Sequence, residues 1–285
     1  MVKVRMTTRW NIRWGAVGTY LSFAVFTFIV LLPVYWMLRS AFSLASDLTK
    51  VPLIYFPNPT LKNFQTLIGE VPFLQYTLNS LIFALSTTLV TLVVGFIAAY
   101  AFARIRVPGS EVILWILLLT MALPDVGTIV PLYQILKNLH LIDTISGITL
   151  VMSSTLAPFT VWVLISFIKQ IPYEIEEAAI LDGASLPQIL WHILIPVTMP
   201  GLVTMGLINF INAWNNLLYP LSFNNSPASK TLSVAITEIY GGYSPYGKPW
   251  ELIMAVGVAM TIPTVILIIF SQKAIVRGLV GGAIK

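Results

Sequence analysis

The chain has 285 residues, of which only 9% are charged and 57% are hydrophobic, and its mean hydropathy is +0.87. Soluble globular chains carry roughly 25% charged residues, so this composition excludes an ordinary water-soluble domain. The net charge of +5 comes from scattered basic residues without a clustered stripe, so no nucleic-acid partner is expected. The absence of cysteine excludes disulfide scaffolds, thiolate zinc sites and cysteine nucleophiles. The chain is therefore predicted to be an all-α membrane protein.

Long stretches without charge predict six transmembrane helices. The first stretch is longer than the ~7–15 apolar residues of a signal peptide, so it is read as a retained helix. The third stretch contains Asp125 beside Pro124, which predicts a kink or a break at that pair. The predicted spans cover residues 16–38, 78–102, 112–136, 144–168, 193–219 and 252–272.

The distribution of lysine and arginine predicts the orientation, because basic connections stay in the cytoplasm. With the N-terminus inside, the cytoplasmic segments hold most of these residues (Lys3, Arg5, Arg9, Arg13, Arg104, Arg106, Lys169, Lys273, Arg277 and Lys285) and the outer loops hold fewer (Lys50, Lys62, Lys137, Lys230 and Lys248). Both termini are therefore predicted to be cytoplasmic. The expected organisation is an N-terminal segment over 1–15, a transmembrane domain over 16–276 and a C-terminal tail over 277–285.

The cytoplasmic connection over residues 170–195 has its own local signals. Pro172 suits a first helical turn, and the acids that follow it favour the positive end of a helix dipole. Gly183 suits a left-handed turn after that helix. Ser185 and Gln188 have the spacing of a capping box for a second short helix, which Pro196 is expected to stop.

This connection is predicted to contact a partner protein. Ala178 and Ala179 are small, so a partner could approach the backbone closely, and the acids could pair with basic groups across the interface. A helix that rests on a membrane surface is usually rich in lysine and arginine, whereas residues 174–182 contain four acids. Docking to a partner therefore fits better than docking to lipid.

The same connection carries a family resemblance. Glu177, Ala178, Ala179, Gly183, Ile193, Ile195 and Pro196 match the EAA motif of ATP-binding-cassette importer permeases, with Ile195 where leucine is usual. Further matches to the carbohydrate-uptake type run over nearly the whole chain (Asn79, Ser80, residues 98–104 and 131–133, Pro158, Trp162, Trp214, Asn215 and residues 278–285). The sequence resembles these permeases and is similar to the second permease subunit of maltose-type importers.

The resemblance implies a function, a location and a set of partners. Residues 170–195 would be a coupling helix seated in a cleft of an ATPase subunit, with Glu177, Ala178, Ala179, Asp182, Gly183, Ile193 and Pro196 as coupling residues. The expected partners are a homologous second permease subunit, two copies of the ATPase and an extracytoplasmic solute-binding protein, in a bacterial or archaeal cytoplasmic membrane. The resemblance also implies a C-terminal tail that reaches into the ATPase dimer.

No Gly-x-x-x-x-Gly-Lys-Ser/Thr loop occurs in the chain, so it is not expected to be an enzyme. ATP and magnesium would be bound by the partner ATPase. No catalytic residue, cofactor site or metal site is expected in this chain.

Polar residues within the spans are candidates for the path of a sugar or sugar-like solute. Asn209, Asn212 and Asn216 have the spacing of one helix face, which fits either a wet path or hydrogen bonds between helices. Asp125 could line the solute entry. Alternatively, it could couple an ion gradient in a secondary transporter, which is the competing function.

Overall fold

The computed structural model describes residues 14–105, 108–241 and 247–283, and this described part is all-helical, without a β-strand. Lipid offers no hydrogen-bond partner to the backbone, so helices satisfy their own peptide groups. The helices are α1 (Trp14–Ala41), α2 (Ala45–Leu48), α3 (Lys62–Glu70), α4 (Phe73–Arg104), α5 (Ser110–Thr120), α6 (Asp125–Asn138), α7 (Ile145–Lys169), α8 (Tyr173–Leu181), α9 (Leu186–Ile189), the π-helical η1 (Leu190–Leu194), α10 (Ile195–Trp214), α11 (Leu218–Phe223), α12 (Leu232–Gly241) and α13 (Trp250–Ala283).

Five helices in the described part are long and apolar enough to cross a membrane, and the broken pair α5 and α6 makes up to six. The two helices of this pair are bent by 102°. Pro124 precedes α6 and has no N–H to continue the hydrogen bonding of α5. The predicted break beside Asp125 is thus confirmed.

The fifth span differs from the prediction. The short helix after Ser185 does not stop at Pro196 but continues through η1 into α10, which ends at Trp214. In η1 the N–H of Ile195 donates to the carbonyl oxygen of Leu190, five residues back. This wider turn accommodates the missing N–H of Pro196, so the predicted stop was wrong.

The predicted last span over residues 252–272 agrees with the apolar part of α13, Trp250–Gln272, and the helix itself continues beyond it to Ala283. Most of the predicted tail over 277–285 is therefore helical and continuous with the last span. Residues 284–285, and most of the predicted N-terminal segment over 1–15, lie outside the described residues.

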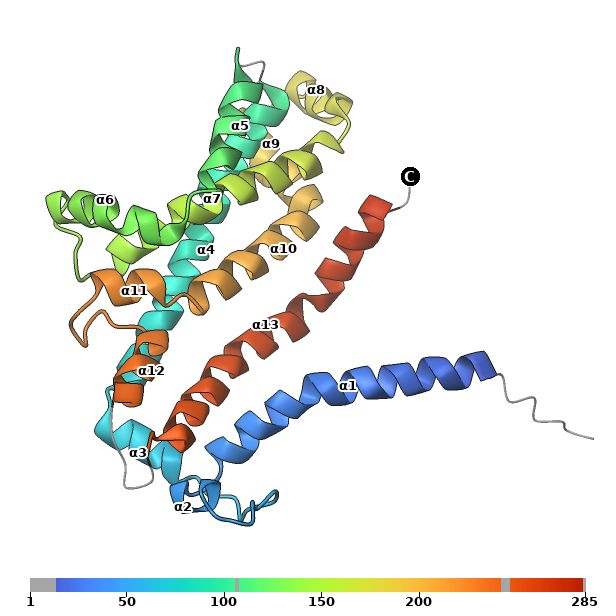
Figure 1. Cartoon of the computed structure of the whole chain (residues 1–285). Helices are drawn as coiled ribbons and strands as arrows, with labels where there is room; N and C mark the ends of the chain where they lie inside the picture. The colour runs from blue at the N-terminus through green and yellow to red at the C-terminus, as the bar shows by residue number, and fades with distance from the viewer. Residues whose placement is uncertain (1–13, 106–107, 242–246, 284–285) are drawn as a thin grey trace, which may run out of the picture.

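The centre of the molecule is formed by α4, α7 and α10, and α13 joins α10 to α1 (Figure 1). Small residues allow these helices to approach closely. A Cβ atom built on Gly95 would lie 2.9 Å from Cγ2 of Thr160, and one on Gly201 would lie 2.7 Å from the ring of Phe167. Tight helix contacts thus fix the geometry of the bundle.

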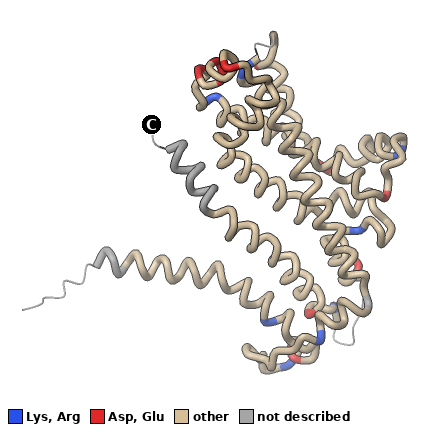
Figure 2. The backbone as a smooth tube through the Cα atoms, turned by 180° about the vertical axis from the view of Figure 1, so that it is seen from behind, with Lys and Arg blue, Asp and Glu red and all other residues tan. Residues whose placement is uncertain are grey.

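Charged residues gather towards the two ends of the bundle (Figure 2). One group surrounds α8, and the other extends from α6 past α12 to α2 and α3, while α4, α10 and α13 have long uncharged stretches between them. Helix α1 diverges from the bundle in Figure 1, and its apolar side chains are exposed, including Tyr20 at 75% and Phe26 at 66%. This surface fits lipid or another membrane subunit.

Candidate functional site

Helix α8 lies at one end of the bundle and presents a mixed apolar and acidic surface (Figure 1). Leu181 is 88% exposed and Ile180 is 53% exposed, which is unusual for large apolar side chains outside the lipid-facing spans. Glu177 and Ala178 are also exposed. The helix therefore offers an apolar patch beside a carboxylate, a combination suited to a protein partner.

The turn after α8 is a Schellman motif. Gly183 has a φ of 84°, so it adopts the left-handed conformation that the sequence predicted. The N–H of Gly183 donates to the oxygen of Ile180 at 3.0 Å, and the N–H of Ala184 donates to that of Ala179 at 2.9 Å. These bonds satisfy carbonyls at the end of α8 and fix the direction in which the chain leaves it.

The second half of the segment that matches the EAA motif starts with the predicted capping box. In this box the N–H of Ser185 donates to Oε1 of Gln188 at 2.8 Å. Ile193 is half-buried in η1, whereas Asp182 and Pro196 are exposed. The motif residues thus extend from a protruding helix into the start of a membrane span. A force on α8 would therefore reach α10 through the turn at Gly183 and the continuous helical segment of α9 and η1.

Glu176 anchors α8 to the bundle. Its carboxylate is buried and lies 2.6 Å from Nε of Arg104 at the end of α4, and Nη2 of Arg104 donates to the oxygen of Ile171 at 2.8 Å. The guanidinium also lies 5.7 Å from the ring centre of Tyr173. The expectation that the acids pair across an interface is wrong for Glu176, because packing brings Arg104 to it within the chain.

A cavity of about 610 Å³ lies among the helices near the break between α5 and α6, and it is called the polar cavity below because its lining includes carboxylate, hydroxyl and amide groups among apolar side chains. Asp125 is the first residue of α6, and its exposed carboxylate lines this cavity. The hydroxyl of Tyr219 in α11 donates to Oδ1 of Asp125 at 3.1 Å and lies 3.2 Å from Oγ1 of Thr155 in α7. Tyr219 and Thr155 were not found from the sequence, because nothing in their local pattern marks them as polar cavity residues.

The three asparagines have different surroundings. Asn209 is buried, and its amide donates to Oγ1 of Thr160 at 3.1 Å, so it makes the hydrogen bond between helices that was one of the two alternatives. Asn212 is exposed and lines the cavity together with Asn209. Asn216 lies beyond the end of α10 and accepts a hydrogen bond from the N–H of Tyr219 at 3.1 Å. The prediction that Asn216 shares the helix face of the other two was wrong, because α10 ends before it.

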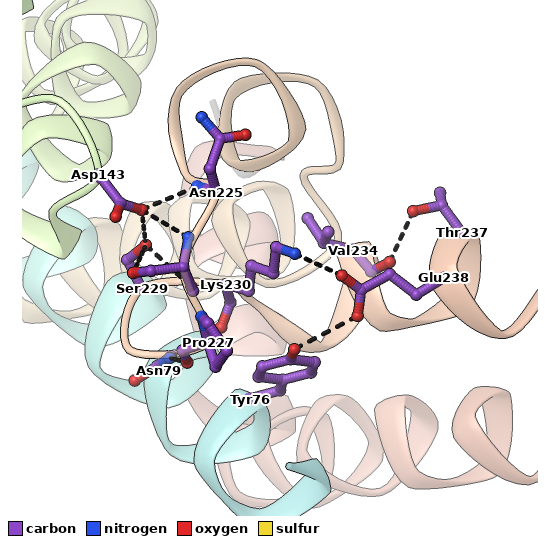
Figure 3. Close-up of polar contacts among 11 residues, drawn as sticks. Tyr76, Asn79, Asp143, Asn225, Pro227, Ser229, Lys230, Val234, Thr237 and Glu238 are labelled. Atoms are coloured by element: carbon purple, nitrogen blue, oxygen red, sulfur yellow. Dashed lines mark hydrogen bonds and ion pairs between the residues drawn. The ribbon is translucent and has the colours of Figure 1, made fainter. Parts of the chain in front are cut away.

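The segment after α11 is held by Asp143, in the loop between α6 and α7 (Figure 3). Oδ1 of Asp143 accepts hydrogen bonds from the N–H groups of Asn225 at 2.8 Å and Ser226 at 2.9 Å, and from the hydroxyl of Ser229. Burial by itself would raise the pKa of Asp143, but these hydrogen bonds lower it to about 2. The N–H of Asp143 also donates to the oxygen of Phe223 at 3.0 Å, so the loop fixes the end of α11.

The same corner is tied to α4 and α12 (Figure 3). The amide of Asn79 in α4 donates to the carbonyl oxygen of Lys230 at 2.8 Å. Lys230 forms an ion pair with Glu238 of α12, in which Nζ of Lys230 donates a hydrogen bond to Oε1 of Glu238. This hydrogen bond raises the pKa of Lys230 above its ordinary value. The hydroxyl of Tyr76 donates to Glu238 at 3.3 Å. The segment that follows α11 is therefore held by α4 and α12 as well as by Asp143.

Comparison with known proteins places this architecture in a family. Residues 91–281, more than half of the chain, match the family described as the binding-protein-dependent transport system inner membrane component. The sulfoquinovosyl glycerol transport system permease protein of Agrobacterium fabrum is 34% identical over 90% of this chain and 89% of its own length. The trehalose transport system permease protein of Mycobacterium tuberculosis is 34% identical over 90% of this chain and 92% of its own length.

Solved structures share the fold. A chain of a bacterial ABC transporter involved in the import of the acidic polysaccharide alginate has a TM-score of 0.79 at 21% identity, with 95% of this chain and 99% of that chain covered. The same kind of transporter in complex with an alginate-bound periplasmic protein gives a TM-score of 0.64 at 15% identity, with 90% of this chain and 92% of that chain covered. These findings give no support to a gradient-driven secondary transporter. The chain belongs to the inner membrane components of binding-protein-dependent transport systems and is a multi-pass permease subunit of an ABC importer, a transport protein and not an enzyme.

Proposed function

We propose that this permease imports a sugar or sugar-like solute through a bacterial or archaeal cytoplasmic membrane, with both termini in the cytoplasm. The relatives support this solute class, because they are named for sulfoquinovosyl glycerol, trehalose and trehalose/maltose transport. The excess of basic residues in the predicted cytoplasmic segments supports the orientation. The last span runs towards the same end of the molecule as α8, as this orientation requires (Figure 1).

The assembly would contain a homologous second permease subunit, two copies of an ATPase that bind ATP and magnesium, and an extracytoplasmic solute-binding protein. A related alginate transporter has been solved with a periplasmic protein, which supports the last of these partners. The exposed apolar length of α1 offers a surface for the second permease.

In this assembly α8 would be the coupling helix. The observation that carries this proposal is the exposure of Leu181, Ile180 and Glu177 on a helix that Glu176 anchors rigidly to α4. A partner seated on this surface could move α8 as a unit, and the Schellman turn at Gly183 would pass the motion to α10. Ala178 and Asp182 are exposed and would face the partner, whereas Ala179 packs against the core of the bundle, so the expected close approach at Ala179 does not hold. Ile193 and Pro196 would lie at the entry to the span.

The polar cavity would be part of the solute path, with Asp125 and Asn212 facing the solute. Asn209 would contribute mainly by fixing α10 against α7 through Thr160. Asn216 would contribute indirectly, through its hydrogen bond to the backbone of Tyr219.

The experiment is ATP-dependent uptake into vesicles that contain the full set of subunits, with co-purification of the ATPase scored in parallel. Glu177→Lys should reduce both, because a reversed charge at a close interface commonly shifts binding by ~2–5 kcal/mol. Glu111→Lys is the matched control, since Glu111 is an exposed acid in the first turn of α5 and lies outside α8.

The outcome separates coupling from its alternatives. Full uptake and full co-purification in Glu177→Lys would show that α8 is not the docking element. If Asp125→Asn abolished uptake while Glu177→Lys had no effect, a gradient-driven mechanism would replace the proposed one.

A further inference from the structure

The charge on the lining of the polar cavity is negative only. Asp125 is its one charged residue among the described residues that line it, and no lysine, arginine or histidine is found there. The carboxylate lies in the first turn of α6, where the positive end of the helix dipole stabilises a negative charge. The hydroxyl of Tyr219 donates to Oδ1 of this carboxylate at 3.1 Å.

The rest of the lining is uncharged and amphipathic. Thr155, Asn212 and Tyr219 supply hydroxyl and amide groups, while Phe159 and Leu132 supply apolar surface. Sugar hydroxyls can donate to a carboxylate or an amide oxygen and accept from an amide N–H or a hydroxyl. The C–H face of a sugar ring fits against apolar and aromatic side chains.

From this arrangement we propose that the cavity selects uncharged sugars and rejects acidic ones, with Asp125 as the residue that determines charge specificity. An anionic solute would approach the carboxylate of Asp125 without a cation on this chain to offset the repulsion. Two like charges a few ångströms apart repel each other even where water has access, and the repulsion grows as the solute displaces water from between them. An uncharged sugar loses nothing to this repulsion and gains a strong hydrogen-bond acceptor. The inference rests on the proposed function, because it concerns the solute of the same transporter.

Tyr219 and Thr155 act as positioning residues in this proposal. The Tyr219 hydroxyl holds the carboxylate of Asp125, and Thr155 holds that hydroxyl from α7. Helix α11 is in turn fixed at its end by the loop at Asp143. The negative charge is thus kept at one place on the cavity wall.

The local potential can be measured because the chain contains no cysteine. In the assembled transporter, Asn212→Cys would be modified by two methanethiosulfonates of similar size, one with a trimethylammonium group and one with a sulfonate. Each rate is divided by the rate with a free thiol, and the same assembly without Asn212→Cys gives the background. The cationic reagent should react faster, and adding Asp125→Asn should lower the cation-to-anion ratio roughly fivefold or more.

Asp125→Asn is a conservative change, because the amide oxygen can still accept from Tyr219. Asp47→Asn is the control, since Asp47 lies on α2, pairs with Lys50 at 2.6 Å and does not line the cavity. This control should leave the ratio unchanged. Equal normalised rates for the two reagents, or no effect of Asp125→Asn, would overturn the assignment of Asp125.

Solute class is tested by protection of the same cysteine from an uncharged reagent. Trehalose, maltose and diacetylchitobiose are the uncharged probes, and an acidic disaccharide of the same size, in which one CH₂OH is a carboxylate, is the charged probe. At least one uncharged sugar should slow the modification, while the acid should do so only after Asp125→Asn. The proposal would be overturned if the acid protected the cysteine while Asp125 is present, or if none of the uncharged sugars protected it.

Uptake is assayed on the transporter without either substitution, together with its solute-binding protein, so that the proposed function and the charge selection are tested separately. A transporter that imports a sugar but reacts equally with both reagents would refute the charge selection and leave the proposed function intact. A cavity that prefers the cationic reagent in a transporter that imports no sugar would refute the proposed function and leave the charge of the cavity established.

Discussion

At the scale of single residues, Asp143 holds the corner that carries α11. One carboxylate oxygen accepts from two backbone N–H groups and a hydroxyl, so its replacement leaves several donors unsatisfied. We expect Asp143→Ala to lower the free energy of unfolding by about 1–3 kcal/mol, measured by thermal unfolding of the assembled transporter. Asp47→Ala, which removes only an exposed ion pair, should have a smaller effect.

The contribution of Asp143 should depend on pH in a defined direction. Its pKa in the folded chain is about 2, below the ordinary value of 3.8. A group with a depressed pKa stabilises the fold fully above its ordinary pKa and loses this contribution as the pH falls through its folded value. The stability difference between the unchanged chain and Asp143→Asn should therefore be constant near neutral pH and shrink between about pH 4 and 2. A difference that grows on acidification would contradict this account.

Glu176 is the second residue whose role was hidden in the sequence. Its carboxylate is buried against Arg104, and removal of one partner from a buried pair commonly costs ~3–5 kcal/mol. We expect Arg104→Ala to destabilise the transporter and to loosen α8, detected as faster proteolysis within residues 170–185. Glu174→Gln is the control, because Glu174 is exposed on the same helix. Equal proteolysis of the two variants would show that the pair does not anchor α8.

At the scale of elements, the turn between α8 and α9 depends on backbone conformation and not on space. Gly183 has a φ of 84°, and a Cβ built there would meet no atom within 4 Å. A side chain costs ~1–2 kcal/mol in this conformation, less for asparagine and more for a β-branched residue. We therefore expect Gly183→Val to reduce uptake strongly at normal membrane abundance, and Gly183→Asn to retain most of it. If both variants failed equally, the constraint would be contact with a partner.

Contact between α7 and α10 is limited by space instead. A Cβ on Gly201 would lie 2.7 Å from the ring of Phe167, so one of the helices must shift. We expect Gly201→Ala to destabilise the chain by about 1–3 kcal/mol, and a second change, Phe167→Leu, to restore part of the loss. Thermal unfolding of the single and double variants measures the coupling. Additive losses would show that the two residues are not in conflict.

The elements that the sequence predicted are those with local causes. The length of the uncharged stretches predicted the spans, and Pro124 predicted the break between α5 and α6. Gly183 and Ser185 predicted the turn after α8 and the cap of α9. The contacts that were missed join distant positions: Arg104 and Glu176 are 72 residues apart, and Asp125 and Tyr219 are 94 residues apart. Such pairs are determined by how helices pack, and no single segment encodes them. The stop expected at Pro196 failed for a related reason, because the π-helical turn compensates locally for the proline.

At the scale of the whole molecule, the chain has exposed surfaces of two chemical kinds. Helix α1 exposes apolar side chains along its length, and α8 exposes a mixed apolar and acidic surface at one end. The first kind suits lipid or a membrane partner, and the second suits a soluble partner. A single chain with both surfaces suits one part of an assembly. Under the proposed function, force would enter at α8 and the solute would pass between the membrane helices.

This division of labour predicts that the purified chain alone hydrolyses no ATP. The 285-residue sequence lacks a loop that could surround the phosphates with backbone N–H groups and a lysine. Phosphate release by the isolated chain should therefore equal that of a detergent blank, and it should appear when the ATPase subunits are added. Glu177→Lys should weaken this reconstituted activity by weakening association, while Asp125→Asn should leave association unchanged. ATP turnover could instead co-elute with the isolated chain in gel filtration and survive the removal of contaminating ATPases. The membrane subunit would then hydrolyse ATP itself, and α8 would not be the link to a separate ATPase.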